Sequence, residues 1–168
     1  MGISPGKAAR NLGIFQAGMR QTIARALREE AGPKILDHIR RRYFRRGGPP
    51  GRDYIVSRTG KLMGSLDLTV QLTSQGAVLR VKMYGPQAKI LEYGGRTRAH
   101  TIRAKAGRVL HWVGADGQDR FARSVRHPGS RFIARRILTR GLNDKRAEIA
   151  RTIKSTLRED WRRKVWAA

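Results

Sequence analysis

Apolar and polar residues alternate strictly along residues 66–73, as they do in a β-strand that buries one face. The sequence Ser74-Gln75-Gly76 favours a turn, and the alternation resumes over residues 77–83. The two runs predict a β-hairpin with one apolar face. Such a face must be covered by another layer of structure, so the chain is constrained to a fold in which a sheet packs on further elements.

Helical patterns flank this hairpin on both sides. An apolar stripe predicts a helix over residues 12–31, and its members are Leu12, Phe15, Met19, Ile23 and Leu27. Gly32-Pro33 interrupts the pattern, so either a second helix starts there or the first one kinks, and residues 47–51 end this region. A C-terminal helix is predicted by a later stripe of Ile149, Ile153, Leu157 and Trp161.

Shorter elements are expected between these helices. Residues 87–93 predict a single helical turn, and residues 96–107 have the composition of a basic loop. The pair Asp116-Gly117 predicts the turn of a second hairpin over residues 109–125. After a break at residues 127–129, Ser130 is expected to cap a helical region, with an interruption at Gly141 and a fresh cap at Asn143.

These elements predict an α+β fold in a single domain of residues 1–168. Its sheet core, residues 57–130, is expected to be a small antiparallel sheet of about four strands made by the two hairpins. The N-terminal helices of residues 1–50 and the C-terminal helices of residues 131–168 are expected to pack on this sheet.

The chain is strongly basic along its whole length. It has 37 lysine and arginine residues against 12 aspartate and glutamate residues, which gives a net charge of +25. Arginine, which makes planar two-point contacts with phosphates and carboxylates, supplies 28 of the basic residues. A compact chain with this charge repels itself, so we expect nucleic acid or acidic proteins as neighbours.

Two basic helix faces are the main candidates for such contacts. The first consists of Arg41, Arg42, Arg45 and Arg46, and the second of Arg151, Lys154, Arg158 and Arg162. Each face is compatible with binding phosphates, with binding an acidic protein and with simple solvation. The sequence leaves these alternatives open.

No residue pattern points to catalysis or to a bound cofactor. The chain has no cysteine, and its four histidines lack the spacing of a metal site. Phosphate-binding glycine motifs are missing, and Glu92, a single acid among apolar neighbours, is expected to pair with an arginine. We therefore expect no catalytic residue, metal or cofactor, and no apolar run is long enough to predict a membrane span.

Three blocks of sequence resemble a known protein family. They are residues 58–66 (RTGKLMGSL), residues 88–102 (AKILEYGGRTRAHTI) and residues 121–130 (FARSVRHPGS). In order and spacing they are similar to the tail-completion, or neck, proteins of long-tailed bacteriophages, a family that includes lambda Z-like minor tail proteins and head–tail joining proteins. The chain departs from that pattern at Gly95, which is an extra residue, at Ala99, which replaces a proline, and in residues 131–136.

The resemblance implies a structural virion protein. Such a protein forms a ring of identical subunits that completes the tail end and joins it to the DNA-filled head. The implied partners are other copies of the chain, a tail terminator or tail-tube protein, and a head-side connector, stopper or portal protein, with packaged DNA as a further candidate contact. The implied location is the neck of the virion and, during assembly, the host cytoplasm.

The second and third blocks contain the residues that we single out as interface candidates. These are Glu92, Tyr93, Gly94, Arg96, Arg98, His100, His127, Pro128 and Gly129. The stretch from Gly94 to His100 has the polarity of a projecting loop, and residues 127–129 predict a rigid corner. Both features fit ordinary fold-defining turns as well as they fit subunit contacts.

Other functions remain open. A tail terminator or a head-side stopper is the nearest alternative within the same structural class. The net charge also fits a basic nucleic-acid-binding protein, whose affinity for DNA would fall steeply with salt. Because DNA must slide through a neck at ejection, we expect most arginines to face neighbouring proteins and few to face the channel.

Overall fold

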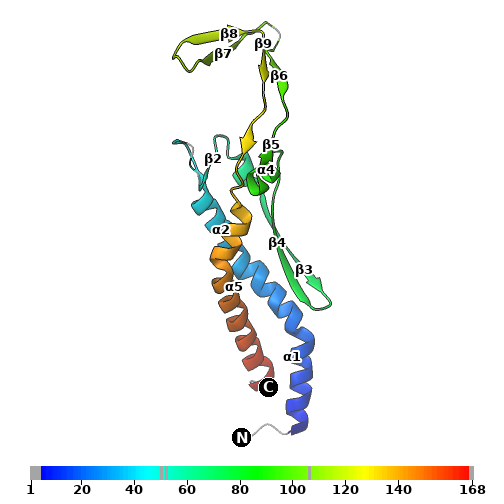
Figure 1. Ribbon diagram of the computed structural model, residues 1–168. Coiled ribbons are helices and arrows are strands. Elements are labelled where there is room, and N and C mark those ends of the chain that lie inside the picture. The colour runs from blue at the N-terminus through cyan, green and yellow to red at the C-terminus, as the bar shows by residue number, and fades with distance from the viewer. Residues whose placement is uncertain (1–4, 50, 52, 106, 167–168) are drawn as a thin grey trace.

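The computed structural model describes residues 5–49, 51, 53–105 and 107–166, and two long helical stretches lie side by side in it (Figure 1). The first stretch comprises α1 (Pro5–Arg25), the π-helical turn η1 (Ala26–Ala31) and α2 (Gly32–Tyr43). The second comprises α5 (Ile137–Trp161) and the π-helical turn η2 (Arg162–Trp166). Within the described residues, no helix combines the length and the apolarity that crossing a membrane requires.

The strands pair two by two. β1 (Phe44–Arg45) and β2 (Ile55–Val56) are parallel, whereas β3 (Leu66–Thr73) and β4 (Gly76–Met83) form the longest antiparallel hairpin. The remaining antiparallel ladders are β5 (Gly95–Arg96) with β10 (Arg131–Phe132), β6 (His100–Arg103) with β9 (Ser124–His127), and β7 (Leu110–Val113) with β8 (Asp119–Ala122). Two short helices, α3 (Lys61–Gly64) and α4 (Ala88–Tyr93), flank the long hairpin.

The predicted α+β class and the hairpin over residues 66–83 are confirmed. The predicted sheet is not, because the strands of the described residues form five separate two-stranded ladders instead of one sheet of about four strands. Residues 96–107, expected to be a loop, contribute the strand β6. Its partner β9 follows only after the whole β7–β8 hairpin, so this pairing has no local sequence signal.

The helix runs through Gly32-Pro33 without ending there, because Ala31 and Gly32 keep right-handed helical dihedrals and the Gly32 amide donates to the carbonyl of Leu27. The expected restart of a second helix is therefore not observed. Pro33 is the second residue of α2 and has no N–H to donate. The turn just before it, η1, is π-helical. This wider turn accommodates the proline ring, which would clash with the preceding carbonyl in a regular α-helix.

The expectations for the last helix are wrong in three respects. Ser130 is not its cap, because residues 131–132 are extended and α5 starts only at Ile137. Gly141 and Asn143 lie inside α5 and interrupt nothing. Gly141 is buried, and a methyl group on it would overlap the side chain of Ile39, so this glycine lets α5 pack closely on α2.

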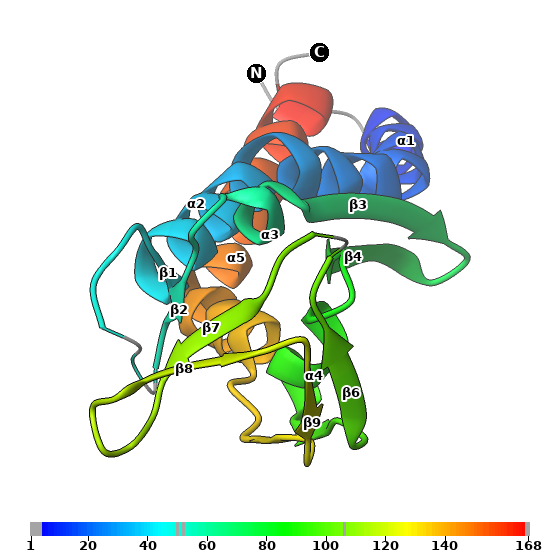
Figure 2. The same cartoon turned by 90° about the horizontal axis from the view of Figure 1, so that it is seen from above.

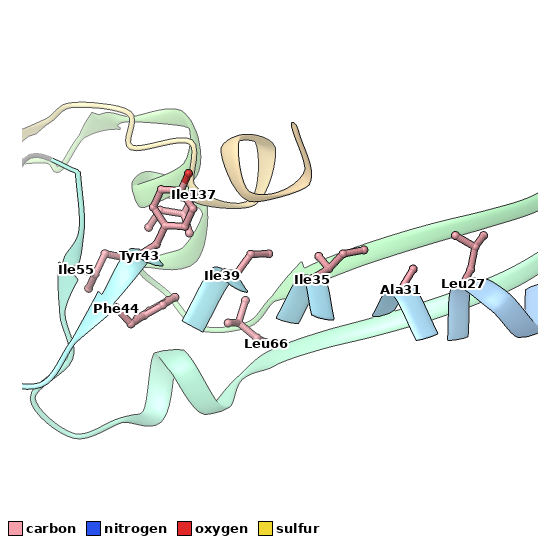
Figure 3. Packing of buried hydrophobic residues seen from close by; sticks show 9 residues of the cluster. All are labelled: Leu27, Ala31, Ile35, Ile39, Tyr43, Phe44, Ile55, Leu66 and Ile137. Atoms are coloured by element: carbon pink, nitrogen blue, oxygen red, sulfur yellow. The ribbon is translucent and has the colours of Figure 1, made fainter. Parts of the chain in front are cut away.

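The hydrophobic core lies between the helices rather than within residues 57–130. Five of its nine buried residues come from η1 and α2, namely Leu27, Ala31, Ile35, Ile39 and Tyr43 (Figure 3). The other four are Phe44, Ile55, Leu66 and Ile137. Leu66 is the one member that lies in the expected sheet core, so the long hairpin covers the helices instead of forming a core of its own.

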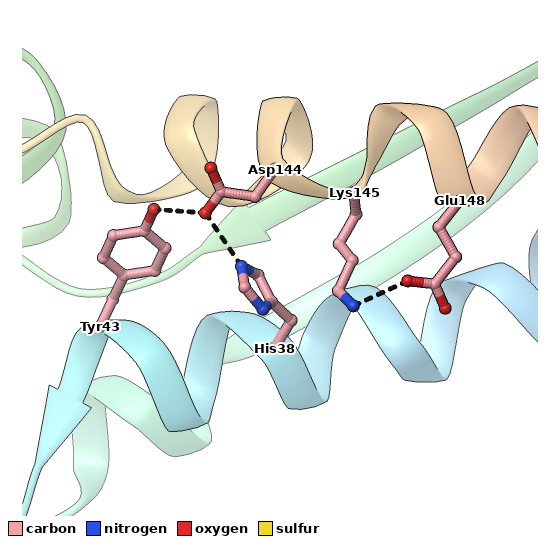
Figure 4. A network of polar contacts seen from close by, with 5 residues as sticks. All are labelled: His38, Tyr43, Asp144, Lys145 and Glu148. Atoms are coloured by element: carbon pink, nitrogen blue, oxygen red, sulfur yellow. Dashed lines mark hydrogen bonds and ion pairs between the residues drawn. The ribbon is translucent and has the colours of Figure 1, made fainter.

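Polar contacts join the helices beside this core. The Tyr43 hydroxyl donates to Oδ2 of Asp144 at 2.7 Å, and Nε2 of His38 lies 2.9 Å from the same oxygen (Figure 4). Hydrogen bonds from His38 and Tyr43 lower the pKa of the Asp144 carboxyl. The next residue of α5, Lys145, pairs with Glu148 of the same helix at 2.7 Å. The two contacts of Asp144 fix α2 against the first half of α5.

Candidate assembly site

Residues 95–132 form a projection that we call the arm, which extends away from the helices in Figure 1 and is seen from above in Figure 2. The β5–β10 ladder is its base, β6–β9 its middle and β7–β8 its tip hairpin. The arm contains most of the interface candidates that the sequence indicates. Each of these three ladders is antiparallel and two-stranded, so each is narrow and has two faces.

The base of the arm is fixed where the second and third motif blocks meet. The amide of Thr97 donates to the carbonyl of Ser130 at 2.9 Å, and the amide of Ser130 donates to Oγ1 of Thr97 at 2.7 Å. Gly129 has φ +90°, and a side chain there would overlap the carbonyl of Thr97. His127 belongs to β9, and the segment between β9 and β10 approaches the segment between β5 and β6 so closely at Gly129 that glycine is required there.

Glu92 anchors the arm to the helical body. The side chain is buried, and its carboxylate accepts hydrogen bonds from the amides of Leu138 and Thr139 at 2.9 and 3.0 Å and from the Thr139 hydroxyl at 2.7 Å. It thus caps α5 from another segment, where the free amides and the helix dipole favour a negative charge. The expectations that Glu92 pairs with an arginine and offers an interface side chain are both wrong.

A hollow of about 830 Å³ lies beside this anchor, and the first two motif blocks line it. The first block contributes Thr59 and Leu62, and the second contributes Ile90 and Thr97. The third block contributes no lining residue, but its Ser130 is hydrogen-bonded to Thr97, and Phe132 lines the hollow from β10. These segments are far apart in the sequence. The hollow therefore joins α3, α4 and the base of the arm into one surface region.

The other interface candidates lie on or beside the arm. Tyr93 is 75% exposed at the end of α4, and Gly94 with φ +73° leads into β5. Arg96, Arg98 and Pro128 are also exposed. His100 and His127 are cross-strand partners in the β6–β9 ladder, with ring centroids 5.2 Å apart.

The structure adds exposed apolar residues on the arm that the sequence analysis did not single out. On one face of the tip hairpin, Val113 is 61% and Phe121 is 64% exposed, and the Phe121 ring stacks on His111 at 4.8 Å. The sequence predicts the hairpin from its Asp116-Gly117 turn, but the exposure of these two side chains depends on which surfaces the described parts of the chain cover.

The second predicted basic face lies on a helix, but the first does not form a single helix face, because α2 ends at Tyr43 and only Arg41 and Arg42 belong to it. The first set, at the end of α2 and in β1, is exposed: Arg41 pairs with Asp37 at 2.8 Å, and the Arg45 guanidinium lies 4.2 Å from the centre of the Tyr54 ring. The second set is exposed along α5 and η2. The structure thus leaves both sets accessible but does not bring them together with the interface candidates.

Comparisons with known proteins identify no family for this chain. No protein-family model, no curated protein and no solved structure matches it.

Proposed function

We propose that the protein is a structural component of a tailed-phage neck. In this proposal it forms a ring of identical subunits, completes the end of the tail and joins it to the DNA-filled head. Its neighbours are other copies of the chain, a tail terminator or tail-tube protein on one side, and a connector, stopper or portal protein on the other. Its action is the formation of interfaces, without catalysis.

The observation that carries the proposal is that the three motif blocks lie next to one another in the fold. The first and second blocks line one hollow, and the second and third are hydrogen-bonded to each other at the base of the arm. Motif residues that serve only local turns have no reason to gather from distant parts of a chain. Their gathering at the root of a projecting element supports a role in positioning that element for contact with another protein.

The arm and the hollow also suit the geometry of a ring. Ring closure needs heterologous contacts, in which one surface of a subunit meets a different surface of the next. The arm offers an exposed apolar tip, and the hollow offers an apolar recess bounded by Leu62, Ile90 and Phe132. An isolated two-stranded hairpin is only marginally stable in water, so the tip gains stability by contact with a neighbour.

The charge of the chain fits acidic neighbours in such an assembly. The exposed basic faces on α2 and α5 would repel one another between subunits unless acidic proteins separated or bridged them. We propose that most arginines face proteins and that few face the DNA channel. A tail terminator or a head-side stopper would share these surfaces and remains the nearest alternative.

Electron microscopy of a lysate from a phage with a stop codon in this gene tests the proposal. Filled heads beside separate tails of normal length are the expected result. Tails of abnormal length would favour the terminator alternative. Intact, joined particles would refute the neck role.

A further inference from the structure

The cations of the arm are unusually free of counter-charges. The arm carries nine lysine and arginine residues against two aspartates, a net charge of +7. Both aspartates lie at the tip, where Asp116 pairs with Arg120 and Asp119 with His111. Each of the other eight cations is exposed, and in the described part of the chain none forms an ion pair: Arg96, Arg98, Arg103, Lys105, Arg108, Arg123, Arg126 and Arg131.

The pairing of the strands concentrates these cations. At the base, Arg96 and Arg131 are direct cross-strand partners, an arrangement that destabilises a ladder unless a counter-charge binds. In the middle, Thr101 pairs with Arg126 and Arg103 with Ser124. Cross-strand partners share a face, and so do residues two apart on a strand. One face of the middle ladder is therefore made only of arginine and hydroxyl side chains.

The bend between the middle and the tip extends this basic face. A hollow of about 400 Å³ at the bend is lined by Lys105, Arg108 and Arg123, together with Ala104, Gly107 and Val109. No carboxylate lines it. We call the polar face of the middle ladder together with this hollow the basic ribbon.

We infer that the basic ribbon binds the phosphate backbone of double-stranded DNA. Arginine, serine and threonine are the side chains that contact phosphates, and a two-stranded ribbon is narrow enough to lie in a DNA groove. A protein interface would contain an apolar centre, which the polar face of the middle ladder lacks. Binding of single-stranded nucleic acid would need aromatic side chains on which bases stack. The aromatic residues Trp112 and Phe121 lie outside the basic ribbon, in the tip hairpin that also carries the two aspartates of the arm.

This inference is independent of the neck role, because it depends on the charges of the arm alone. It is compatible with a chain in which most arginines face proteins. The eight unpaired cations of the arm would then be the few that face DNA.

The test is binding of the purified protein to a labelled DNA duplex of mixed sequence, measured by fluorescence anisotropy at several salt concentrations. One variant combines Arg103→Gln, Arg123→Gln and Arg126→Gln. The matched control combines Arg151→Gln, Lys154→Gln and Arg158→Gln on α5, where all three residues are exposed. Both variants lose the same net charge, and circular dichroism checks that both stay folded.

We expect the arm variant to bind much more weakly than the control. In about 0.1 M salt each phosphate contact is worth roughly eight-fold in affinity, so loss of three contacts weakens binding by about 100-fold or more. The slope of log affinity against log salt should fall by roughly 0.9 per lost contact, or about 2.7. Equal weakening in the two variants, no binding by the wild type, or equal affinity of the wild type for poly-glutamate would overturn the inference.

Discussion

At the scale of single residues, the carboxylate of Glu92 determines where the last helix starts. Arg136, the residue before α5, has φ +49° and supplies no side-chain cap, so the first amides of the helix need a partner from elsewhere. Glu92 provides it from α4, across more than forty residues of sequence. One side chain thereby fixes the helix start, the position of α4 and the root of the arm.

Substitution of this carboxylate should destabilise the whole fold. Glu92→Gln removes the charge and leaves an amide group facing the amide donors of Leu138 and Thr139. We expect the free energy of unfolding to fall by about 2 kcal/mol in urea denaturation, because three hydrogen bonds to a buried charged group are weakened. Glu159→Gln, at an exposed position on α5, is the control and should change stability little. Equal stability of the two variants would contradict the anchor role.

A second buried carboxylate makes stability depend on pH. Burial alone would raise the pKa of Asp160, but the Lys164 ammonium at 2.9 Å and the Thr22 hydroxyl at 2.8 Å outweigh it and hold the pKa below its usual range. A lowered pKa in the folded state stabilises the protein above the ordinary carboxyl pKa of about 4. This contribution disappears as the pH falls through the folded-state pKa.

Asp160→Asn should therefore be less stable than the wild type at neutral pH, by about 1–3 kcal/mol. Between about pH 5 and pH 2, the stability of this variant should fall less steeply than that of the wild type, because the variant lacks the carboxyl group of Asp160. Urea denaturation over this pH range measures both effects. Asp37→Asn, at an exposed position, should follow the wild-type curve. Parallel curves for Asp160→Asn and wild type would show that Asp160 does not contribute.

At the scale of elements, substitution of alanine for glycine should have opposite effects on stability at two positions in the helices. Alanine at Gly141 would overlap Ile39 in the contact between α2 and α5. Alanine at Gly13, in α1, meets no atom within 4 Å. We expect Gly141→Ala to lower the melting temperature, at a cost of about 1–3 kcal/mol from overpacking. Gly13→Ala should raise stability by up to about 1 kcal/mol through helix propensity. Stabilisation by both changes would mean that the helices are not closely packed at Gly141.

Elements with local signals were predictable from the sequence, whereas elements fixed by distant partners were not. The hairpin over residues 66–83 follows from its own alternation. The start of α5 at Ile137 has no local signal, because its first amides bond to Glu92 of α4. The strand β6 has none either, because its residues pair with β9, which lies beyond the tip hairpin.

The candidate site was predictable in part for the same reason. The motif blocks and the corner at residues 127–129 could be found from residue types. The hollow that the first two blocks line, and the exposure of the apolar tip residues, depend on which surfaces the rest of the chain covers. Sequence patterns show that a face is apolar, but they do not show whether it is buried within the subunit.

At the scale of the whole molecule, the helices and the long hairpin provide the stability of the fold, whereas the arm provides the surfaces for contact with partners. The core lies between the helices and the long hairpin, and none of the nine buried core residues belongs to the arm. The arm instead exposes an apolar tip and an unpaired set of cations. Changes at the tip should therefore affect assembly while leaving the fold of the body intact.

Complementation of the stop-codon phage tests this central claim most directly. The tip variant Val113→Ser with Phe121→Ser is supplied from a plasmid, and joined particles are counted by electron microscopy. The control, Ile14→Ser with Leu72→Ser, removes two equally exposed apolar residues from outside the arm. We predict that the control restores joined virions, whereas the tip variant, with an unchanged melting temperature, leaves filled heads and separate tails. Joined particles at the wild-type frequency with the tip variant would contradict the claim that the arm is an assembly element.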